Sequence, residues 1–180
     1  MDGMMTSSEE PSCDTASSRP ALHRALLAVG SFGPIGHLPA SGTVAAAVVG
    51  IPAYWVLAER LNATALLWGA VIVVFCGLSI AVHAVGDRML GEKDSRVLVW
   101  DEVAGYLIAV AFLPWSWRLA VTAWVLERAF DILKIPPANW VEKRCPGGWG
   151  VVGDDVVAGI YARVIIAIVL AIRPGLAGLA

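Results

Sequence analysis

Residues 100–113 read WDEVAGYLIAVAFL, with two adjacent carboxylates, Asp101 and Glu102, at the start of an apolar run. The run is apolar enough to leave water, but a charged side chain at the edge of hydrocarbon costs roughly 3 kcal/mol unless something compensates it. Neighbouring carboxylates also repel each other, so a cation is their natural compensator. The stretch therefore indicates an acidic site at the end of an apolar helix.

A similar pattern recurs toward the carboxyl end of the chain. Residues 154–159 read DDVVAG, and Asp154 and Asp155 stand ahead of the apolar run 156–172. Two acid pairs at two apolar boundaries predict a single shared site, provided that both boundaries face the same compartment.

The composition favours a membrane protein with one domain. The 180 residues are 58% hydrophobic and 16% charged, and the mean hydropathy is +0.71; a soluble domain is nearer about half apolar and about a quarter charged. Residues 1–20 are polar and aperiodic, so we expect a disordered tail before a single helical domain at 21–180. A net charge of −2 provides no basic field for nucleic acid, and no protein partner is predictable.

Segment lengths predict an all-α fold, an integral membrane helical bundle with short interfacial helices and acid-rich loops. Residues 64–83 carry no formal charge over twenty positions, the length that spans a bilayer. Further crossings are expected near 43–57, 103–114, 119–133 and 156–172. The runs in 103–114 and 119–133 are short, so this pair of helices could sink only partly into the bilayer.

The basic residues predict the side on which the acid-rich loops lie. With these crossings, the N-terminal region and the loops 84–101 and 134–155 share one side, which has nine Lys or Arg residues against three on the other. Cytoplasmic loops are enriched in Lys and Arg. We therefore expect both acid pairs, and any site that they form, to face the cytoplasm.

Most of the acidic residues lie in one part of the chain. Ten of the fifteen fall between residues 87 and 155, where oxygen ligands would suit Mg²⁺ and its phosphate partners. Arg128, Asp131 and Lys134 lie on neighbouring turns of one helix, and the two basic residues would supply charge for phosphate. The alternative for 127–134 is a solvated helix end with routine ion pairs. A P-loop, a Gly-x-Ser-x-Gly elbow and a phosphate-cradling cysteine loop are absent, which leaves carboxylate–metal chemistry.

Two other patterns were weaker indicators of a site. A loop rich in glycine and proline around residues 30–42 would let backbone approach a ligand, and Ser41 and Thr43 can cap the helix that follows; a plain connector would have the same composition. The spacing of Asp87, Asp94 and Asp101, every seven residues, would align them on one helical face unless Gly91 interrupts the helix. His83 is interpreted as a core or interfacial histidine.

Five blocks occur in order between about residues 25 and 173: Gly36-x-Leu38-Pro39-x-x-Gly42-Thr43, the Asp94 loop, Val99-Trp100-Asp101-Glu102-x-x-Gly105, Arg128-x-x-Asp131-x-x-Lys134, and Gly147-Gly148-x-Gly150-x-x-x-Asp154-Asp155-x-x-Ala158-Gly159. This ordered set resembles the phosphatidylglycerophosphatase A family, Mg²⁺-dependent lipid phosphatases of bacteria. The resemblance implies an all-helical enzyme of phospholipid biosynthesis, in the bacterial inner (plasma) membrane. Such an enzyme removes the terminal phosphate of phosphatidylglycerophosphate, a membrane phospholipid, to leave phosphatidylglycerol.

The resemblance also implies roles for the acidic residues. Asp101, Asp131 and Asp155 would be the Mg²⁺ ligands, and either Glu102 or Asp154 would be the general base.

The same resemblance assigns the residues around the phosphate. Arg128 and Lys134 would hold it, Asp94 is a second-rank candidate for the site and Asp87 follows it. A substrate phosphate loop would close over the group, formed by Gly36, Pro39, Gly42 and Thr43.

Three departures from the family's pattern leave every matched carboxylate in place. Ser41 stands where the family usually has proline, residues 135–137 read IPP rather than Pro-x-Pro, and Glu127 stands where an apolar or aromatic residue usually precedes the arginine.

Two other functions remain open on the sequence alone. A CDP-alcohol-type lipid phosphotransferase also uses aspartates and metals at a bilayer surface, but its Asp-Gly…Ala-Arg…Gly…Asp…Asp pattern is absent. A non-enzymatic cation-transporting membrane protein would carry its acids in mid-span, whereas these acids lie mostly at the ends of the predicted spans.

Overall fold

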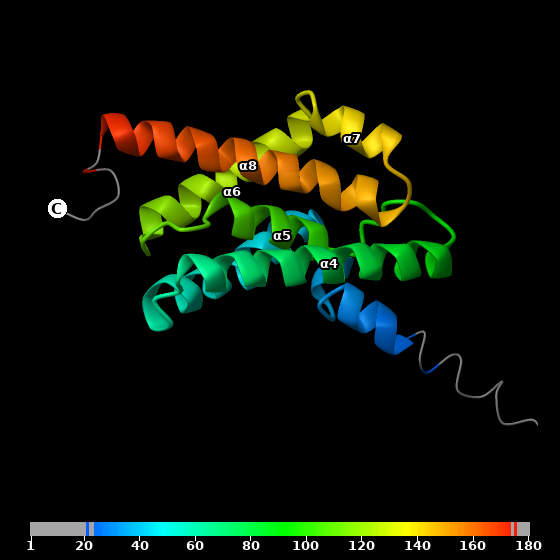
Figure 1. Cartoon of the computed structure of the whole chain (residues 1–180). Helices are drawn as coiled ribbons and strands as arrows, with labels where there is room; N and C mark the ends of the chain where they lie inside the picture. Colours follow the sequence, from blue (N-terminus) through cyan, green and yellow to red (C-terminus); the bar gives the residue numbers. More distant parts are fainter. Residues whose placement is uncertain (1–20, 22–23, 174, 176–180) are drawn as a thin grey trace, which may run out of the picture.

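The computed structural model describes residues 21, 24–173 and 175, and every regular element in this part of the chain is a helix (Figure 1). The all-α prediction is therefore confirmed. Residues 24–30 are helical, and the elements after them are η1 (Ile35–His37), α2 (Ser41–Ala45), η2 (Ala46–Gly50), α3 (Ile51–Trp55), η3 (Val56–Arg60), α4 (Ala65–Leu90), α5 (Trp100–Ala109), α6 (Trp117–Leu133), α7 (Ala138–Arg144) and α8 (Gly148–Ile172). The disordered tail predicted for 1–20 lies outside the described residues.

Three helices are long and apolar enough to cross a membrane. They are the continuous helix Ser41–Arg60, formed by α2 to η3, together with α4 and α8, and their mean hydropathies are 1.6, 2.5 and 2.3. The surface of α4 carries exposed Leu66, Val73 and Val74. Apolar surface of this extent on a long helix is typical of contact with lipid.

The predicted crossings at 103–114 and 119–133 are not among these three helices. α5 has only 10 residues, about 15 Å of helix, and it is almost entirely buried. α6 has 17 residues, and its last turn approaches the same cavity as the first turn of α5, so α6 runs back toward the start of α5. Residues 100–133 therefore form a hairpin of two helices, α5 and α6, within the bundle. Because it returns to its starting side, the predicted sidedness of the loops is unaffected.

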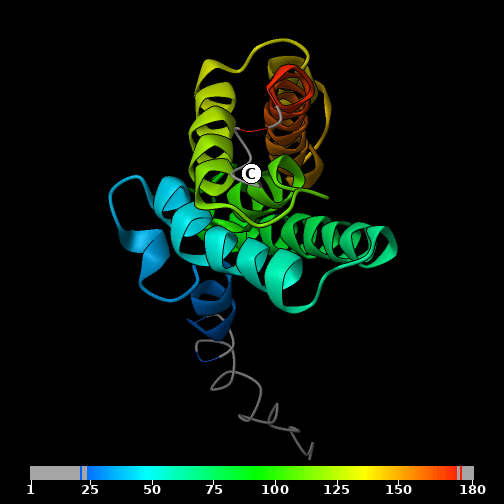
Figure 2. The same cartoon turned by 90° about the vertical axis from the view of Figure 1, so that its left-hand side faces the viewer.

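α5 lies in the middle of the bundle. Figures 1 and 2 show α6 and α8 side by side on one side of α5, and α4 and the Ser41–Arg60 helix on the other. Val103, Tyr106 and Leu107 of α5 are buried in the core. A central helix with neighbours on both sides explains why a run as short as α5 is as apolar as a membrane span.

Glycines allow α5 and α8 to cross closely. A Cβ atom added to Gly159 would lie 2.3 Å from the carbonyl oxygen of Gly105, and one added to Gly105 would lie 2.9 Å from the carbonyl oxygen of Asp155. Small residues at a helix crossing permit this backbone approach. The crossing brings the acid pair at the start of α5 to the acid pair of α8.

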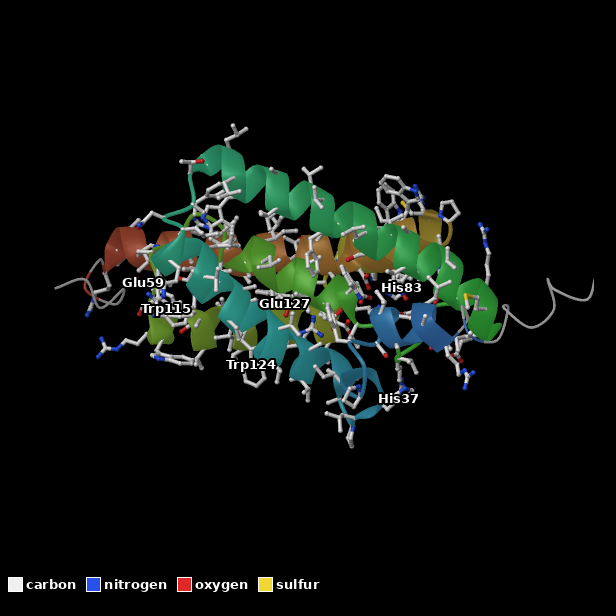
Figure 3. The ribbon with its side chains drawn as sticks, turned by 90° about the horizontal axis from the view of Figure 1, so that it is seen from below. His37, Glu59, His83, Trp115, Trp124 and Glu127 are labelled. Carbon is white, nitrogen blue, oxygen red and sulfur yellow. The ribbon has the colours of Figure 1, made fainter. Side chains whose placement is uncertain are left out.

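The turn between α5 and α6 is held at the other end of the bundle. The Tyr54 hydroxyl donates a hydrogen bond to the carbonyl oxygen of Pro114, and Arg163 Nε donates to that of Ala111 at 2.7 Å. The Tyr54 and Trp115 rings are 5.0 Å apart. Figure 3 shows Trp115 and Glu59 at this end, with His83 toward the opposite end.

We predict that Gly159→Ala lowers the free energy of unfolding by about 1–3 kcal/mol, because its methyl group must push the α5 backbone away. Gly77→Ala in α4 is the matched control, since its Cβ would meet nothing within 4 Å, and a helical Gly→Ala change favours folding by about 0.5–1 kcal/mol. Thermal unfolding of the detergent-solubilised proteins measures both. Equal unfolding temperatures for the two variants would contradict the close crossing.

Candidate active site

A cavity of about 590 Å³ opens at the end of the bundle where α5 begins. Every predicted site residue except Asp87 lines it. These residues are Gly36, Pro39, Gly42, Thr43, Asp94, Asp101, Glu102, Arg128, Asp131, Lys134, Asp154 and Asp155. Five separate blocks of sequence therefore meet at one place, although the role of each residue stays a prediction.

Three helices supply five of the six carboxylates of the cavity, and the loop 91–99 supplies Asp94. Asp101 and Glu102 lie in the first turn of α5, where the helix dipole favours negative charge. Asp131 lies near the end of α6, and Asp154 and Asp155 lie within α8. The sequence prediction started the last helix at 156, but α8 begins at Gly148, so its acids are held on helical backbone rather than on a loop.

Arg128 is bonded to three carboxylates. Its Nε donates to Glu127 Oε2 at 2.7 Å, Nη2 donates to Glu127 Oε1 and to Asp155 Oδ1, and Nη1 donates to Asp131 Oδ2 at 3.2 Å. Burial alone would lower the pKa of Arg128, but these partners raise it above its ordinary value, so the guanidinium stays charged. Arg128 thus joins α6 to α8 at the base of the cavity.

Lys134 makes a second link between helices. It caps the end of α6 with a positive φ of 43°. Its Nζ donates to Asp154 Oδ2 at 2.7 Å and lies 3.0 Å from Glu142 Oε2 of α7. The predicted basic pair is therefore already engaged with the acids, in a network that is buried around Arg128 and partly exposed around Lys134.

Asp101 is held from behind by a histidine. His83, fully buried on α4, places Nε2 at 3.2 Å from Asp101 Oδ2 and Nδ1 at 3.6 Å from Asp87 Oδ1. Burial would raise the pKa of Asp101, but the His83 contact more than offsets it, and the pKa lies below its usual value. One oxygen of Asp101 therefore lies in close contact with His83, a residue that does not line the cavity.

The negative charge of Glu102, next to Asp101, is largely uncompensated. Burial raises the pKa of Glu102 well above its usual value, and the neighbouring charge of Asp101 raises it further. Asp101 Oδ1 and Glu102 Oε2 are buried and have no hydrogen-bond partner in the described part of the chain. Buried polar atoms of this kind are uncommon in proteins and call for a partner.

Asp87 does not line the cavity, and it is not aligned with Asp94 and Asp101 on one helix, because Gly91 interrupts the helix as the sequence had suggested. α4 ends at Leu90, and Gly91 has a φ of 73°, so no single helix carries all three acids. The Asp87 carboxylate accepts the backbone N–H groups of Asp94 and Ser95 at 3.2 and 3.3 Å. Asp87 therefore shapes the loop 91–99, whose Asp94 does reach the cavity.

The loop before α2 closes another side of the cavity. A Cβ on Gly42 would lie 1.9 Å from Glu102 Oε1, so only glycine fits against that side chain. Ser41 is not a helix cap as predicted; Ala40 precedes the helix with a positive φ of 54°, and the Ser41 hydroxyl donates to the carbonyl oxygen of Arg96 at 2.6 Å. Thr43 likewise caps nothing, and its carbonyl oxygen accepts Trp124 Nε1 at 3.0 Å.

The donor set suits Mg²⁺ in its chemistry. Six carboxylates line the cavity, and Mg²⁺ prefers oxygen ligands. The unpartnered oxygens of Asp101 and Glu102 are consistent with a cation near them. Within the described ranges, however, no three acidic, His or Cys side chains surround a common point, because Arg128 and Lys134 hold Asp131, Asp154 and Asp155. Coordination by these three would require local side-chain movement.

Two residues important to the cavity were not identified from the sequence. Glu127 was interpreted as a departure from the family's pattern, yet it is fully buried and holds two N–H groups of Arg128. Its position next to an arginine in an apolar helix was the available signal. For His83 the signal was its i,i+4 spacing from Asp87, which could not indicate the contact with Asp101.

Fold and site together define a class: an all-helical protein with helices suited to a membrane and a cavity whose acidic and basic side chains suit a phosphate ester. The family model described as Phosphatidylglycerophosphatase A matches residues 28–170. The chain belongs to the phosphatidylglycerophosphatase A family.

Curated relatives agree with this membership. The chain is 33% identical over 147 residues to the Phosphatidylglycerophosphatase A of Haemophilus influenzae, covering 78% of this chain and 85% of that protein. It is 32% identical over 94 residues to that of Escherichia coli, covering 51% and 55%. It is also 35% identical over 134 residues to a Bacteroides thetaiotaomicron protein named "Putative phosphatidylinositol-3-phosphatase", covering 71% and 80%. No solved structure matches the chain.

We predict that Glu127→Ala destabilises the protein by roughly 3 kcal/mol, because it leaves buried N–H groups of Arg128 without acceptors. Glu59→Ala, at an exposed position at the other end of the bundle (Figure 3), should change stability by less than about 0.5 kcal/mol. Thermal unfolding in detergent measures the difference. An E127A protein as stable as E59A would show that Glu127 does not stabilise the fold through its hydrogen bonds to Arg128.

Proposed function

We propose that this protein hydrolyses the terminal phosphate of phosphatidylglycerophosphate to phosphatidylglycerol and phosphate, in an Mg²⁺-dependent reaction at the cytoplasmic face of the bacterial plasma membrane. The observation that carries the proposal is the meeting of the family's separate sequence blocks in one cavity of carboxylates and basic groups. The lipid phosphatase activity follows from family membership; the metal, the residue roles and the membrane orientation are the parts that we add.

The orientation is supported by the position of the cavity and by charge. The cavity lies at the end of the bundle that carries the loops 91–99 and 134–147. The loop 91–99 includes Lys93 and Arg96, and α7 ends with Lys143 and Arg144; positive charge favours the cytoplasmic side. A site at the end of membrane helices suits a substrate whose phosphate is in water while its acyl chains are in the bilayer.

Arg128 and Lys134 would bind the reacting phosphate with the hydrogens that they have left. An arginine has five N–H donors, and four of those of Arg128 are bonded to carboxylates. Lys134 has three, and two are used by Asp154 and Glu142. Each therefore keeps one donor for a phosphate oxygen, and the carboxylates fix the direction in which it points.

Asp101, Asp131 and Asp155 would hold Mg²⁺, with His83 orienting Asp101 from behind. When bound, the ion would supply charge that stabilises the phosphoryl oxygens and favours deprotonation of water. Contacts to ligand residues of this kind often matter almost as much as the ligands themselves.

Glu102 is the better candidate for the general base. Its Oε2 has no partner in the described part of the chain and it lines the cavity. Asp154 is instead bonded to Lys134 and to the backbone N–H of Asp155. Glu102 would accept a proton from the attacking water as the bond between phosphorus and the glycerol oxygen breaks.

We expect the purified protein in detergent to release phosphate from phosphatidylglycerophosphate when Mg²⁺ is present and to stop when a chelator removes it. Phosphatidylinositol 3-phosphate and CDP-diacylglycerol, each with and without Mg²⁺, are parallel substrates. A faster reaction on phosphatidylinositol 3-phosphate would reassign the substrate. Release of CMP, or metal flux into vesicles without phosphate release, would instead support the phosphotransferase or the transporter.

Asp131→Asn should reduce Mg²⁺-dependent phosphate release by at least about 100-fold while the protein stays folded. Asp131 is only half-buried and is nearly isosteric with asparagine, so the loss would come from its charge. Glu59→Gln, at the end of the bundle opposite to His83 (Figure 3) and not among the residues that line the cavity, should retain wild-type activity. Full activity of D131N, measured as phosphate released per folded protein, would remove Asp131 from the metal site.

A further inference from the structure

One of the basic residues that line the cavity is not engaged by the acids. Three basic residues line it, and two of them, Arg128 and Lys134, are bonded to carboxylates. The third, Arg96, is exposed, and among the described residues its guanidinium has no ion-pair or hydrogen-bond partner. Its positive charge is therefore available to a ligand, whereas most of the donors of the other two are already used.

The backbone of Arg96 is held in place although its side chain is not. The Ser41 hydroxyl donates to its carbonyl oxygen at 2.6 Å, and the N–H of the preceding Ser95 donates to Asp87 at 3.3 Å. On the other side, Gly36 packs so closely that a Cβ would lie 2.2 Å from the carbonyl oxygen of Val97. Arg96 therefore lies where the segments 36–43 and 91–99 meet. Its backbone is fixed by these contacts, while its side chain keeps its freedom.

Apolar side chains accompany this basic residue at the cavity. Leu38 and Ile132 line the same cavity and are 46% and 75% exposed. One cavity thus combines buried carboxylates with an unpaired arginine and exposed apolar groups. That combination suits an anionic headgroup whose acyl chains continue into the bilayer.

The proposed substrate carries two anionic groups, and the cavity residues described so far account for only one. The terminal phosphomonoester would react among the carboxylates, next to Arg128 and Lys134. The phosphodiester, which joins the headgroup to diacylglycerol, is closer to the acyl chains and needs its own partner. Arginine binds phosphate through a planar fork and remains charged at every physiological pH.

We propose that Arg96 binds the phosphodiester of the substrate and so selects lipids that carry a phosphodiester in addition to the phosphomonoester. This assignment rests on the proposed function, because it concerns the same cavity and the same lipid. Phosphatidylinositol 3-phosphate has the same pair of groups, so Arg96 separates both of these lipids from phosphatidic acid, which has the monoester alone.

The test compares Arg96→Ala with Arg88→Ala, an exposed arginine that lines a different cavity. We expect R96A to lower kcat/KM for phosphatidylglycerophosphate by about 10- to 100-fold, mainly through KM, as loss of one charge-assisted phosphate contact would. R96K should recover part of the loss, and R88A should behave as wild type. An unchanged KM in R96A, or an equal loss in R88A, would overturn the proposal.

A binding measurement separates this proposal from the proposed function. Isothermal titration of dioctanoyl phosphatidylglycerol, which has the diester only, and of dioctanoyl phosphatidic acid needs no catalysis. We expect R96A to weaken binding of phosphatidylglycerol at least 10-fold and to leave phosphatidic acid unchanged. Equal weakening of both lipids would contradict a diester-specific role. A wild-type protein that binds phosphatidylglycerol through Arg96 but releases no phosphate would refute the proposed function alone.

Discussion

The excess of negative charge in a largely buried cavity is the constraint on which the rest of this structure depends. Six carboxylates line the cavity with three basic side chains, so full ionisation would leave a charge of −3. Such an excess destabilises a folded protein unless charge is compensated or protons are bound. The bundle compensates part of it with Arg128 and Lys134, which at the same time connect α6, α7 and α8.

Two buried residues outside the cavity make this compensation specific. Glu127 accepts hydrogen bonds from Nε and Nη2 of Arg128, while Nη1 donates to Asp131 and Nη2 also donates to Asp155. His83 Nε2 lies 3.2 Å from one oxygen of Asp101, and the other oxygen has no hydrogen-bond partner in the described part of the chain. Burial raises the pKa of Glu127 to about 7, against the opposing effect of Arg128. The charges of the site are thus oriented by neighbours that a substrate would never touch.

The close crossing of α5 and α8 makes the arrangement possible. Gly105 and Gly159 allow the two backbones to approach, and the acid pair of each helix stands about one turn from its glycine. A wider separation would leave two separate acid pairs, each at its own helix. The similar sequences DEVAG at 101–105 and DDVVAG at 154–159 therefore lie on the two sides of one helix–helix contact.

The sequence predicted most of the residues that line the cavity, but not which of its apolar runs would form a short, buried helix. Polar blocks such as the one from Arg128 to Lys134 can be recognised from the types and spacing of their residues, which the sequence gives directly. The run 103–114 has the apolar composition of a lipid-facing helix but belongs to a short, buried helix, and only the packing around α5 distinguishes the two. Glu127 and His83 were missed for a related reason: their burial and their partners are set by other helices, not by neighbouring residues in the chain. Serine is a common helix cap, but the Ser41 hydroxyl donates instead to the carbonyl oxygen of Arg96, in a loop over fifty residues away.

The most direct test of this account measures whether the cavity binds a divalent cation without any substrate. Thermal unfolding of the purified protein in detergent would be followed as Mg²⁺ is raised from zero to millimolar concentrations. Because binding to the folded state alone stabilises it, we predict that the unfolding temperature of the wild type rises with Mg²⁺ and that the rise is lost in Asp131→Asn. An unfolding temperature that does not change with Mg²⁺ in the wild type would contradict the account, because the negative charge of the cavity would then be balanced without a metal ion.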